Sequence, residues 1–390
     1  MDDWSRLLAG FSLIAGLILA YLYYYGQSTG RQGKTLTDFF AVTGVAPPKP
    51  LPDFDVRTAK PRPYRPFRWA YHQTMALMPM DPDYWLELES TYHERIAQRL
   101  EIYRKNGKAV VDAMPGSELA CQELMEMVIQ YLCVRYPNSF SYDDVSGTFY
   151  NRILDTETPN VLEKTGVAAL ETVLENVPED FPMMMKDEKG VYRLRCGITL
   201  SAIGWNMQQK MGKTMPEIHE PVPFYQEKLK SSIERYFSKL TCDKPIQRGS
   251  WGIEIGQPLY LQTTDPHWAL RDKQDPALSV ADLYLRVDWQ TLRRLPHSRA
   301  IVFNYKALFT PVTQLRREPY IPRLVATVIK NAASEFLEYK AAFHTEHKLV
   351  PALEKWAKEQ EDSGIVPRDW SVRTLDEHPF FPGWEELTRV

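Results

Sequence analysis

The segment 205–223, WNMQQKMGKTMPEIHEPVP, contains one histidine in surroundings that suit chemistry. His219 is followed by Glu220 and then by Pro221-Val222-Pro223. Proline fixes φ and has no backbone N–H, so these prolines should hold His219 on a rigid turn. A rigidly held imidazole suits an axial ligand to iron or a general base, because both tasks tolerate little misplacement. An ordinary turn histidine is the alternative interpretation.

A second segment, residues 285–296 (LRVDWQTLRRLP), is rich in arginine. On a strand, Arg286 and Gln290 would lie on one face, and Arg293 and Arg294 would close the strand end. Arginines at this density could bind a carboxylate or a propionate bidentately. A solvent-facing strand with salt bridges is the alternative.

Signatures of the common enzyme classes are absent from the sequence. The chain has no P-loop, no G-x-S-x-G elbow and no G-x-G-x-x-G, and its cysteines lack zinc or iron–sulfur spacing. His344 and His347 lie one helical turn apart, which suits a metal, but a solvated helix face is the commoner explanation of such a pair.

Alternating and helical patterns indicate which elements position these residues. Residues 191–200, 282–292 and 299–308 alternate apolar and polar side chains, as strands do, and the short connection at 293–298 predicts an antiparallel pair. Helical patterns follow the caps at Asp81-Pro82 and Pro115-Gly116-Ser117, and they return at 324–339 and 351–360. Helices, an antiparallel sheet and further helices predict the α+β class.

The composition narrows the possible partners and compartments. The chain has 390 residues, a net charge of −3 and four cysteines without paired spacing. We therefore expect no broad nucleic-acid-binding surface and no disulfide-built secreted fold. The chain contains no N-x-S/T sequon, which agrees with a cytosolic body.

The N-terminus predicts a membrane anchor. Residues 7–25 carry no charge and have tyrosine at four of their last five positions, and their 19 residues would span about 28 Å as a helix. We expect residues 1–30 to form a single transmembrane helix, with the bulk of the chain cytosolic. Seven of the twenty residues at 47–66 are proline, so residues 31–66 are expected to form a proline-rich basic linker.

The collinear motifs together resemble the haem-dependent oxidative N-demethylase α-subunit-like family, also called the HRQ family. Residues 75–100 (MALMPMDPDYWLELESTYHERIAQRL) resemble the family's opening motif, and Met114–Glu118 is similar to its L-P-G-S-E. Residues 205–223 are similar to its W-x4-K-x-G-x5-I-H-x-P-V-P, and residues 285–303 to its L-R-V-E-R-Q-T-L-R-R-L-P-x-S-x-A-x-x-F. The resemblance covers roughly residues 67–358, so we expect a domain at 67–360 and a tail at 361–390.

The resemblance implies a Per-Arnt-Sim (PAS)-like haem-binding body with an antiparallel sheet and flanking helices. It also implies a monooxygenase-type oxidoreductase that uses haem b and O₂ to oxidise a small amine, with release of formaldehyde. A separate reductase must then supply electrons, because the sequence has no flavin, nicotinamide or iron–sulfur motif. A membrane tether would suit an apolar substrate or a membrane-bound reductase.

The same resemblance assigns roles to individual residues. It implies His219 as the iron ligand or an essential pocket group, and Arg286 and Gln290 as further catalytic positions. Lys210, Arg248 and Arg293 are expected to bind propionates or substrate. The family's E-R-Q-T reads Asp288-Trp289-Gln290-Thr291 here, so a tryptophan replaces an arginine.

Two other functions are compatible with the same sequence. PAS-like bodies commonly sense redox state or gases, so a haem-binding sensor is one alternative, although no output domain follows residue 360. A membrane-anchored binding protein that has lost the haem is the other.

Overall fold

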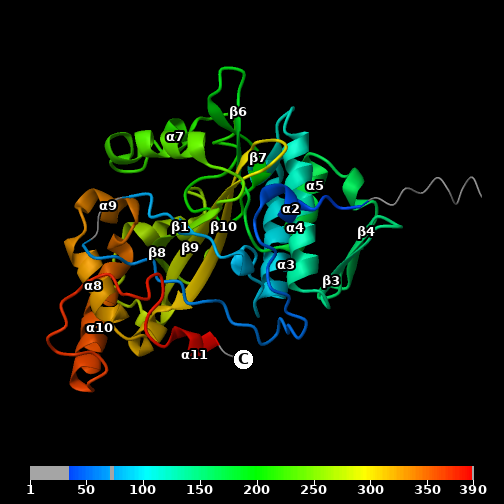
Figure 1. Ribbon diagram of the computed structural model, residues 1–390. Helices are drawn as coiled ribbons and strands as arrows, with labels where there is room; N and C mark the ends of the chain where they lie inside the picture. Colours follow the sequence, from blue (N-terminus) through cyan, green and yellow to red (C-terminus); the bar gives the residue numbers. More distant parts are fainter. Residues whose placement is uncertain (1–34, 71–73, 389–390) are drawn as a thin grey trace, which may run out of the picture.

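An antiparallel sheet lies at the centre of the molecule (Figure 1). The computed structural model describes residues 35–70 and 74–388. Within these residues the main sheet has, in spatial order, β1 (Met78–Pro79), β8 (Ile246–Ile255), β9 (Leu283–Arg294), β10 (Ile301–Pro311), β6 (Met183–Lys186), β7 (Tyr192–Ile198) and β2 (Val111–Ala113). A smaller sheet contains β3 (Phe140–Asp143), β4 (Thr148–Asn151) and β5 (Thr156–Thr158).

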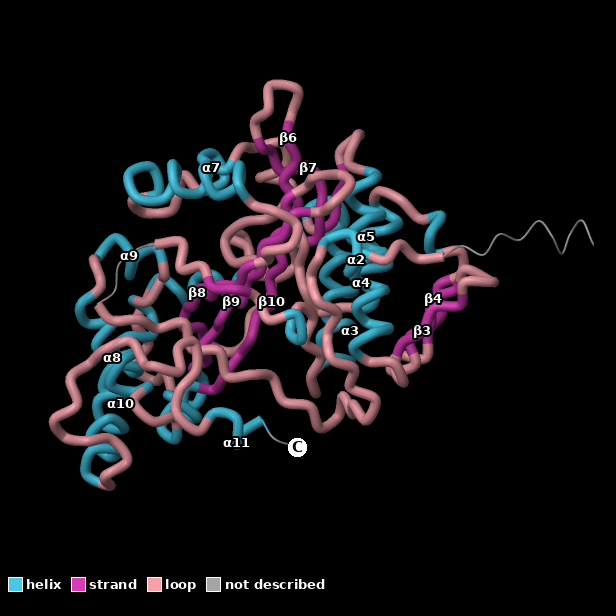
Figure 2. The backbone as a smooth tube through the Cα atoms, viewed as in Figure 1, coloured by secondary structure: helices cyan, strands magenta, loops and turns pink. Residues whose placement is uncertain are grey.

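Helices gather on both sides of the central strands (Figure 2). Helices α3 (Tyr92–Asn106), α4 (Glu118–Arg135) and α5 (Val167–Asn176) form one group, and α8 (Ile321–Asn331), α9 (Ser334–Tyr339) and α10 (Phe343–Asp362) form another. The remaining helices are α2 (Phe39–Thr43), α6 (Met215–Ile218), α7 (Lys230–Lys239) and α11 (Trp384–Thr388). The architecture is therefore α+β with antiparallel sheets, and its likeness to a PAS body stays a prediction.

The longest strand pair is the β9–β10 hairpin, as the alternating pattern predicted. Ile301 pairs with Arg294, and the register continues to Pro311 opposite Tyr284. The connecting turn is fastened by Glu123 of α4, whose carboxylate accepts hydrogen bonds from the backbone N–H groups of His297 (2.7 Å) and Ser298 (2.9 Å). The P-x-S part of the motif therefore forms the turn that ties the hairpin to α4.

Two predicted helices begin or divide differently in the structure. Asp81 caps only a short 3₁₀ turn at Pro82–Tyr84, and α3 begins at Tyr92. Between them, Trp85, Leu86, Leu88 and Glu89 are buried, with Leu86 fully inaccessible to solvent. The pattern at 324–339 is split because Ala332 has extended backbone angles between α8 and α9.

Residues 35–66, expected to form a spacer, lie in part against the domain. Arg65 and Glu318 form a buried ion pair with N–O distances of 2.7 and 2.5 Å. Tyr64 is 2% exposed and packs on β8 at Gly249, where a Cβ atom would come within 2.6 Å of the tyrosine ring. Contacts this close make the segment part of the folded body.

The C-terminal tail lies beside the same segment. The Arg65 N–H donates to the Pro379 carbonyl at 2.6 Å, and the Trp69 N–H donates to Thr374 Oγ1 at 3.0 Å. Phe381 is 1% exposed. We call residues 64–69 and 374–381 the clasp, because these two stretches from opposite ends of the chain are hydrogen-bonded to each other.

The predicted transmembrane helix has to be corrected. No helix in residues 35–70 and 74–388 has the length and apolar character needed to cross a bilayer. The segment 7–25, to which the sequence analysis assigned the anchor, lies outside the described residues. The structure therefore does not support a fold preceded by a membrane span, nor a single-pass membrane localisation.

Candidate functional site

Side chains from three neighbouring strands form the floor of a cavity. Residues directly opposite each other in an antiparallel sheet point to the same face. One such row contains Arg248 of β8, Gln290 of β9 and Tyr305 of β10, because both Arg248 and Tyr305 pair with Gln290. The next row towards α7 is apolar and contains Leu292 and Phe303.

The cavity above this face contains about 1250 Å³ of empty space, its mouth included. It adjoins a second hollow of about 2160 Å³, and both are lined by the same central residues, including His219, Ser250 and Gln290. Both values include open space at the mouths of the hollows. Because they share these lining residues, the two hollows lie side by side around His219 and Gln290.

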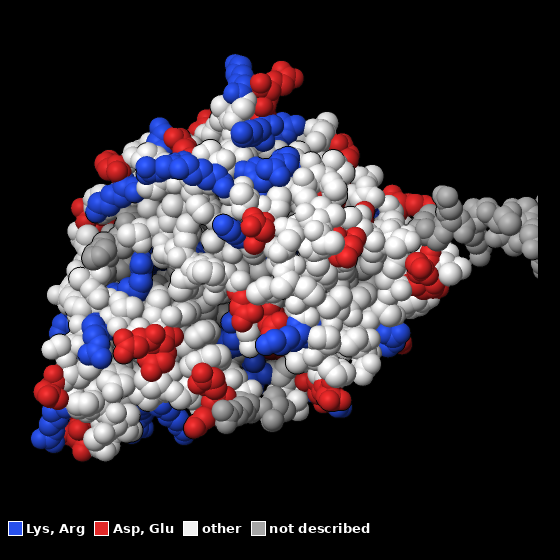
Figure 3. Space-filling view, viewed as in Figure 1, with Lys and Arg blue, Asp and Glu red and all other residues white. Residues whose placement is uncertain are grey.

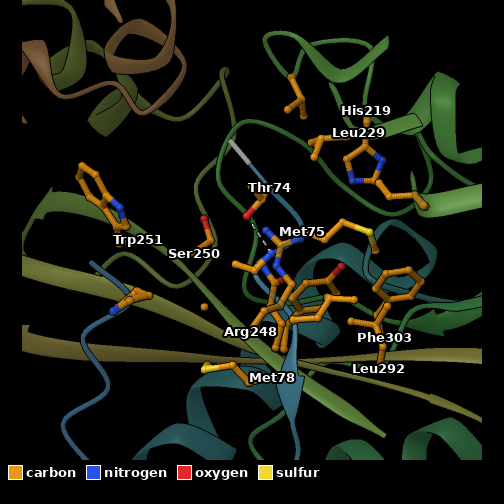
Figure 4. Close-up of a pocket in the computed structure, with 18 of the residues that line it drawn as sticks. Thr74, Met75, Met78, His219, Leu229, Arg248, Ser250, Trp251, Leu292 and Phe303 are labelled. Atoms are coloured by element: carbon orange, nitrogen blue, oxygen red, sulfur yellow. Dashed lines mark hydrogen bonds between the residues drawn. The ribbon is translucent and has the colours of Figure 1, made fainter. Parts of the chain in front are cut away.

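His219 lies at the apolar end of this cavity. Figure 4 shows its ring close to Leu229, with Phe303 and Leu292 below. The imidazole stacks on Tyr225 with ring centroids 5.0 Å apart and an angle of 10° between the planes. The ring is thus held from one side by an aromatic neighbour.

The hydrogen bonding of His219 fixes its tautomer. Nδ1 lies 3.0 Å from the Met215 carbonyl oxygen, one turn earlier on α6. A carbonyl oxygen can only accept, so Nδ1 carries the proton and Nε2 carries the lone pair. Burial, the largest cause, together with Lys210 and Arg248 lowers the pKa of His219 to about 4, against the opposing effect of the hydrogen bond to the Met215 carbonyl. The imidazole is therefore neutral at pH 7 with a basic Nε2.

Lys210 supports the turn that holds His219. Its Nζ donates to the carbonyl of Ile218 at 3.3 Å and lies 4.1 Å from the centre of the Trp205 ring. Burial lowers the pKa of Lys210 to about 8, and Lys213 adds to this shift. Lys210 therefore links the tryptophan of the sequence motif to the backbone of its I-H pair.

Arg286 lines the second hollow, but its guanidinium is already hydrogen-bonded to other parts of the protein. Its guanidinium donates to the Pro258 carbonyl at 3.0 Å, to the Ser201 carbonyl at 2.8 Å and to Asp288 at 2.9 Å. These bonds hold two loops against β9. The expected bidentate binding of a ligand carboxylate would require Arg286 to leave these partners.

Arg293 lies on the opposite face of β9, away from His219. Its guanidinium stacks at 3.8 Å on the ring of Trp85, beside a small separate cavity that also contains Phe39. Burial lowers the pKa of Arg293 to about 10. Of the residues named from the sequence, His219, Lys210, Arg248, Arg286 and Gln290 border the two hollows, whereas Arg293 does not.

The sequence analysis missed Ser250 and Lys340. Lys340 Nζ donates to Ser250 Oγ at 2.7 Å, and both residues line the two hollows. Burial lowers the pKa of Lys340 to about 8. Lys340 follows a short helix 90 residues after Ser250, so no local pattern joins them, although the alternation of β8 could have placed Ser250 beside Arg248.

The histidine pair at 344 and 347 does not form a metal site. His344 Nδ1 lies 2.7 Å from the Ala341 carbonyl, and His347 Nε2 lies 2.9 Å from the Asp275 carbonyl. No group of three or more metal-ligating side chains was found in the part of the chain that the structure describes.

The fold and the cavity define an α+β ligand-binding domain with a neutral histidine at an apolar end. A family model described as "Haem-dependent oxidative N-demethylase, alpha subunit-like" matches residues 76–350. The match covers well over half of the chain, so the chain belongs to this family. The family resemblance is thereby confirmed, and the family description names haem dependence and oxidative N-demethylation.

The residues around His219 fit a haem. A neutral imidazole with its Nδ1–H donated to a carbonyl is the usual form of a histidine metal ligand. Apolar side chains suited to a macrocycle surround it, and they are Met75, Met215, Val222, Leu229, Ile233, Phe237, Leu292 and Phe303. The acceptor of the Nδ1–H is the Met215 carbonyl of α6, four residues before the histidine.

Proposed function

We propose that this protein is a haem-dependent oxidoreductase that removes an N-methyl group from a small amine, with His219 as the residue that would bind the haem iron. The observation that carries the proposal is the Nδ1–Met215 hydrogen bond, because it leaves Nε2 unprotonated in the cavity. In the described part of the chain, no hydrogen-bond partner occupies Nε2.

The chain's own residues would bind the cofactor and orient the substrate. The apolar side chains around His219 would enclose the macrocycle, and Arg248 is placed to neutralise a propionate. A bound haem, for which we propose haem b, would supply the iron at which O₂ is reduced. The Gln290 amide can both donate and accept, so it can orient an amine or its product in the middle of the cavity.

The overall reaction requires a redox partner. An N-methylamine, O₂, two electrons and two protons give the demethylated amine, formaldehyde and water. The C–N bond to the methyl carbon breaks, and that carbon leaves as formaldehyde. We propose that a separate reductase supplies the two electrons, since the sequence contains no flavin, nicotinamide or iron–sulfur motif.

The proposal is tested by the absorption spectrum of the full-length protein. We expect a haem Soret band in the wild type and its loss in His219→Ala, with the far-UV circular dichroism unchanged. His267→Ala is the matched control, because His267 is exposed on a 3₁₀ segment outside both hollows, and it should keep the band. An unchanged Soret band in His219→Ala would refute the ligand assignment.

Turnover separates an enzyme from a haem-binding sensor. With a reductase and O₂, formaldehyde should appear in a one-to-one ratio with the demethylated amine. Haem that is reduced and binds O₂ without any formaldehyde, for a broad panel of N-methylamines, would contradict the enzymatic proposal.

A further inference from the structure

We propose that the substrate bears a carboxylate, which Lys340 and Arg68 bind at the end of the cavity away from His219. The inference rests on the proposed function and names its substrate class: an N-methylated amine with an apolar body and a carboxylate. Of the two cations, Lys340 lies within the residues that the family model matches and Arg68 lies before them.

The cavity has two chemically different ends. Figure 4 shows His219, Leu229 and Phe303 on one side and Ser250 and Trp251 on the other, with Arg248 between them. The first end is apolar apart from the imidazole. The second end carries hydroxyl groups and cations on an aromatic wall. A cofactor that takes the first end leaves the second for a substrate.

The ammonium group of Lys340 lies among aromatic side chains at the second end of the cavity. Its Nζ lies 5.5 Å from the ring centres of both Trp251 and Phe336 and is hydrogen-bonded to Ser250. Such a wall would otherwise suit a methylammonium cation. With Lys340 in place, a simple alkylammonium would meet a like charge, whereas a carboxylate would find a charge-assisted donor.

The charged side chains that line the first hollow also favour an anionic group on the ligand. Arg68, Arg248 and Lys340 line the first hollow, and no carboxylate is among the described residues that line it. Asp288, opposite Ser250 in the sheet, lines the second hollow with Lys340. It accepts from Arg286 Nε at 2.9 Å and also raises the pKa of Lys340, so its single charge is shared between two cations. Figure 3 shows a recess at the left of the view with Lys or Arg side chains inside it.

Arg68 is supplied by the clasp and lies before the matched residues 76–350. Its Nη2 donates to Thr74 Oγ1 at 3.1 Å. His378, from the other half of the clasp, lines the same wall. Burial and then Arg68 lower the pKa of His378 to about 4, so this imidazole is neutral at pH 7 and can serve as a hydrogen-bonding group. The clasp therefore adds Arg68 and His378 to the lining of a hollow whose other cations, Arg248 and Lys340, lie within the matched residues.

A matched pair of ligands tests the inference in the full-length, haem-loaded protein. N-methylphenylalanine and N-methylphenethylamine differ only in the carboxylate, and calorimetry should show tighter binding of the acid. Lys340→Met should weaken binding of the acid about 10- to 100-fold, as expected for loss of a charge-assisted hydrogen bond, and should not weaken binding of the amine, because it removes a like charge from the wall. Lys355→Met is the control, because Lys355 is exposed on α10, away from the cavity.

Other outcomes overturn the proposal. Equal or tighter binding of the amine, or an acid affinity that Lys340→Met leaves unchanged, would exclude a carboxylate site here. Acid binding that haem loading abolishes would show that the propionates take these cations instead. If Lys340→Met fails to fold, Arg68→Gln makes the same test, since Arg68 is only half-buried. Absence of a Soret band would refute the proposed haem-dependent function. Titration of the haem-free protein with the same two ligands would then still show whether the carboxylate site exists.

Discussion

Burial controls the protonation of three histidines at the scale of single residues. Burial is the largest cause that lowers the pKa of His219, His344 and His378, in each case to about 4. Each lies near an arginine that lowers its pKa further: Arg248, Arg271 and Arg68 respectively. At pH 7 all three are therefore neutral, and each can act only as a hydrogen-bonding group or a ligand.

His344 provides the clearest pH test, because it is 1% exposed and lies outside the cavity near His219. Its folded pKa of about 4 is below the unfolded value, so the unfolded chain takes up the proton first as the pH falls. Its stabilising effect is complete above the unfolded pKa and is lost as the pH falls towards 4. Between about pH 7 and about pH 5 this should remove about 2 kcal/mol from the free energy of unfolding.

Urea unfolding at the two pH values measures this loss. His344→Gln should show a smaller loss than the wild type by that amount, because His219 and His378 titrate in both proteins. His267→Gln, at an exposed site, should match the wild type. The same pH dependence in His344→Gln as in the wild type would show that His344 takes up a proton as readily in the folded as in the unfolded state.

Single residues of the candidate site could be predicted where a motif fixes the local backbone. The prolines beside His219 and the lysine nine residues earlier were visible in the sequence, and the structure brings Lys210 into contact with the carbonyl before His219. The roles of the arginines could not be predicted from the sequence, because a guanidinium can bind a ligand carboxylate or a loop carbonyl equally well. Only the fold shows that Arg286 holds loops and that Arg293 stacks on Trp85.

At the scale of elements, the clasp makes the two extensions part of the domain. The Arg65–Glu318 pair joins residues 253 positions apart, and both side chains are at most 4% exposed. Because removal of one partner of a buried pair leaves the other charge without compensation, Arg65→Met should lower the free energy of unfolding by about 3–5 kcal/mol.

Chemical denaturation of matched variants checks the role of the clasp. Arg57→Met is the control in the same segment, because Arg57 pairs with Asp55 at the exposed surface, and it should leave stability unchanged. Arg65→Met combined with Glu318→Met should recover most of the loss, since no buried charge then remains unpaired. A wild-type midpoint in Arg65→Met alone would mean that the segment does not contribute to folding.

Elements with local signals were predicted well, and those fixed by distant contacts were not. The β9–β10 hairpin follows from period-two alternation and a short turn. The position of residues 35–66 depends on Tyr64, Arg65 and their distant partners, none of which changes the local proline-rich pattern that indicated a spacer. The start of α3 shifted for a similar reason, because burial of Trp85 and Leu86 outweighs the cap at Asp81.

At the scale of the whole molecule, two apolar clusters meet at the cavity. One contains Trp251 and Phe336 and includes residues of α8 and α10. The other contains Leu229 and Phe303 and includes residues of α7. A third cluster, built around α3, α4 and α5, has no residue in the lining of the first hollow. A ligand in the cavity would therefore contact the first two clusters directly and reach the third only through the sheet.

Haem binding should consequently stabilise the molecule unevenly. A ligand that binds only the folded state adds about 2.7 kcal/mol at a concentration 100 times its Kd. Hydrogen exchange should slow most in residues 215–239, which carry His219 and α7, and little in α4. Haem-loaded His219→Ala should exchange like the unloaded wild type. Equal protection of α4 and α7 would contradict this prediction. It would mean that the amides exchange only when the whole domain unfolds, so that the cavity walls do not open as a separate unit.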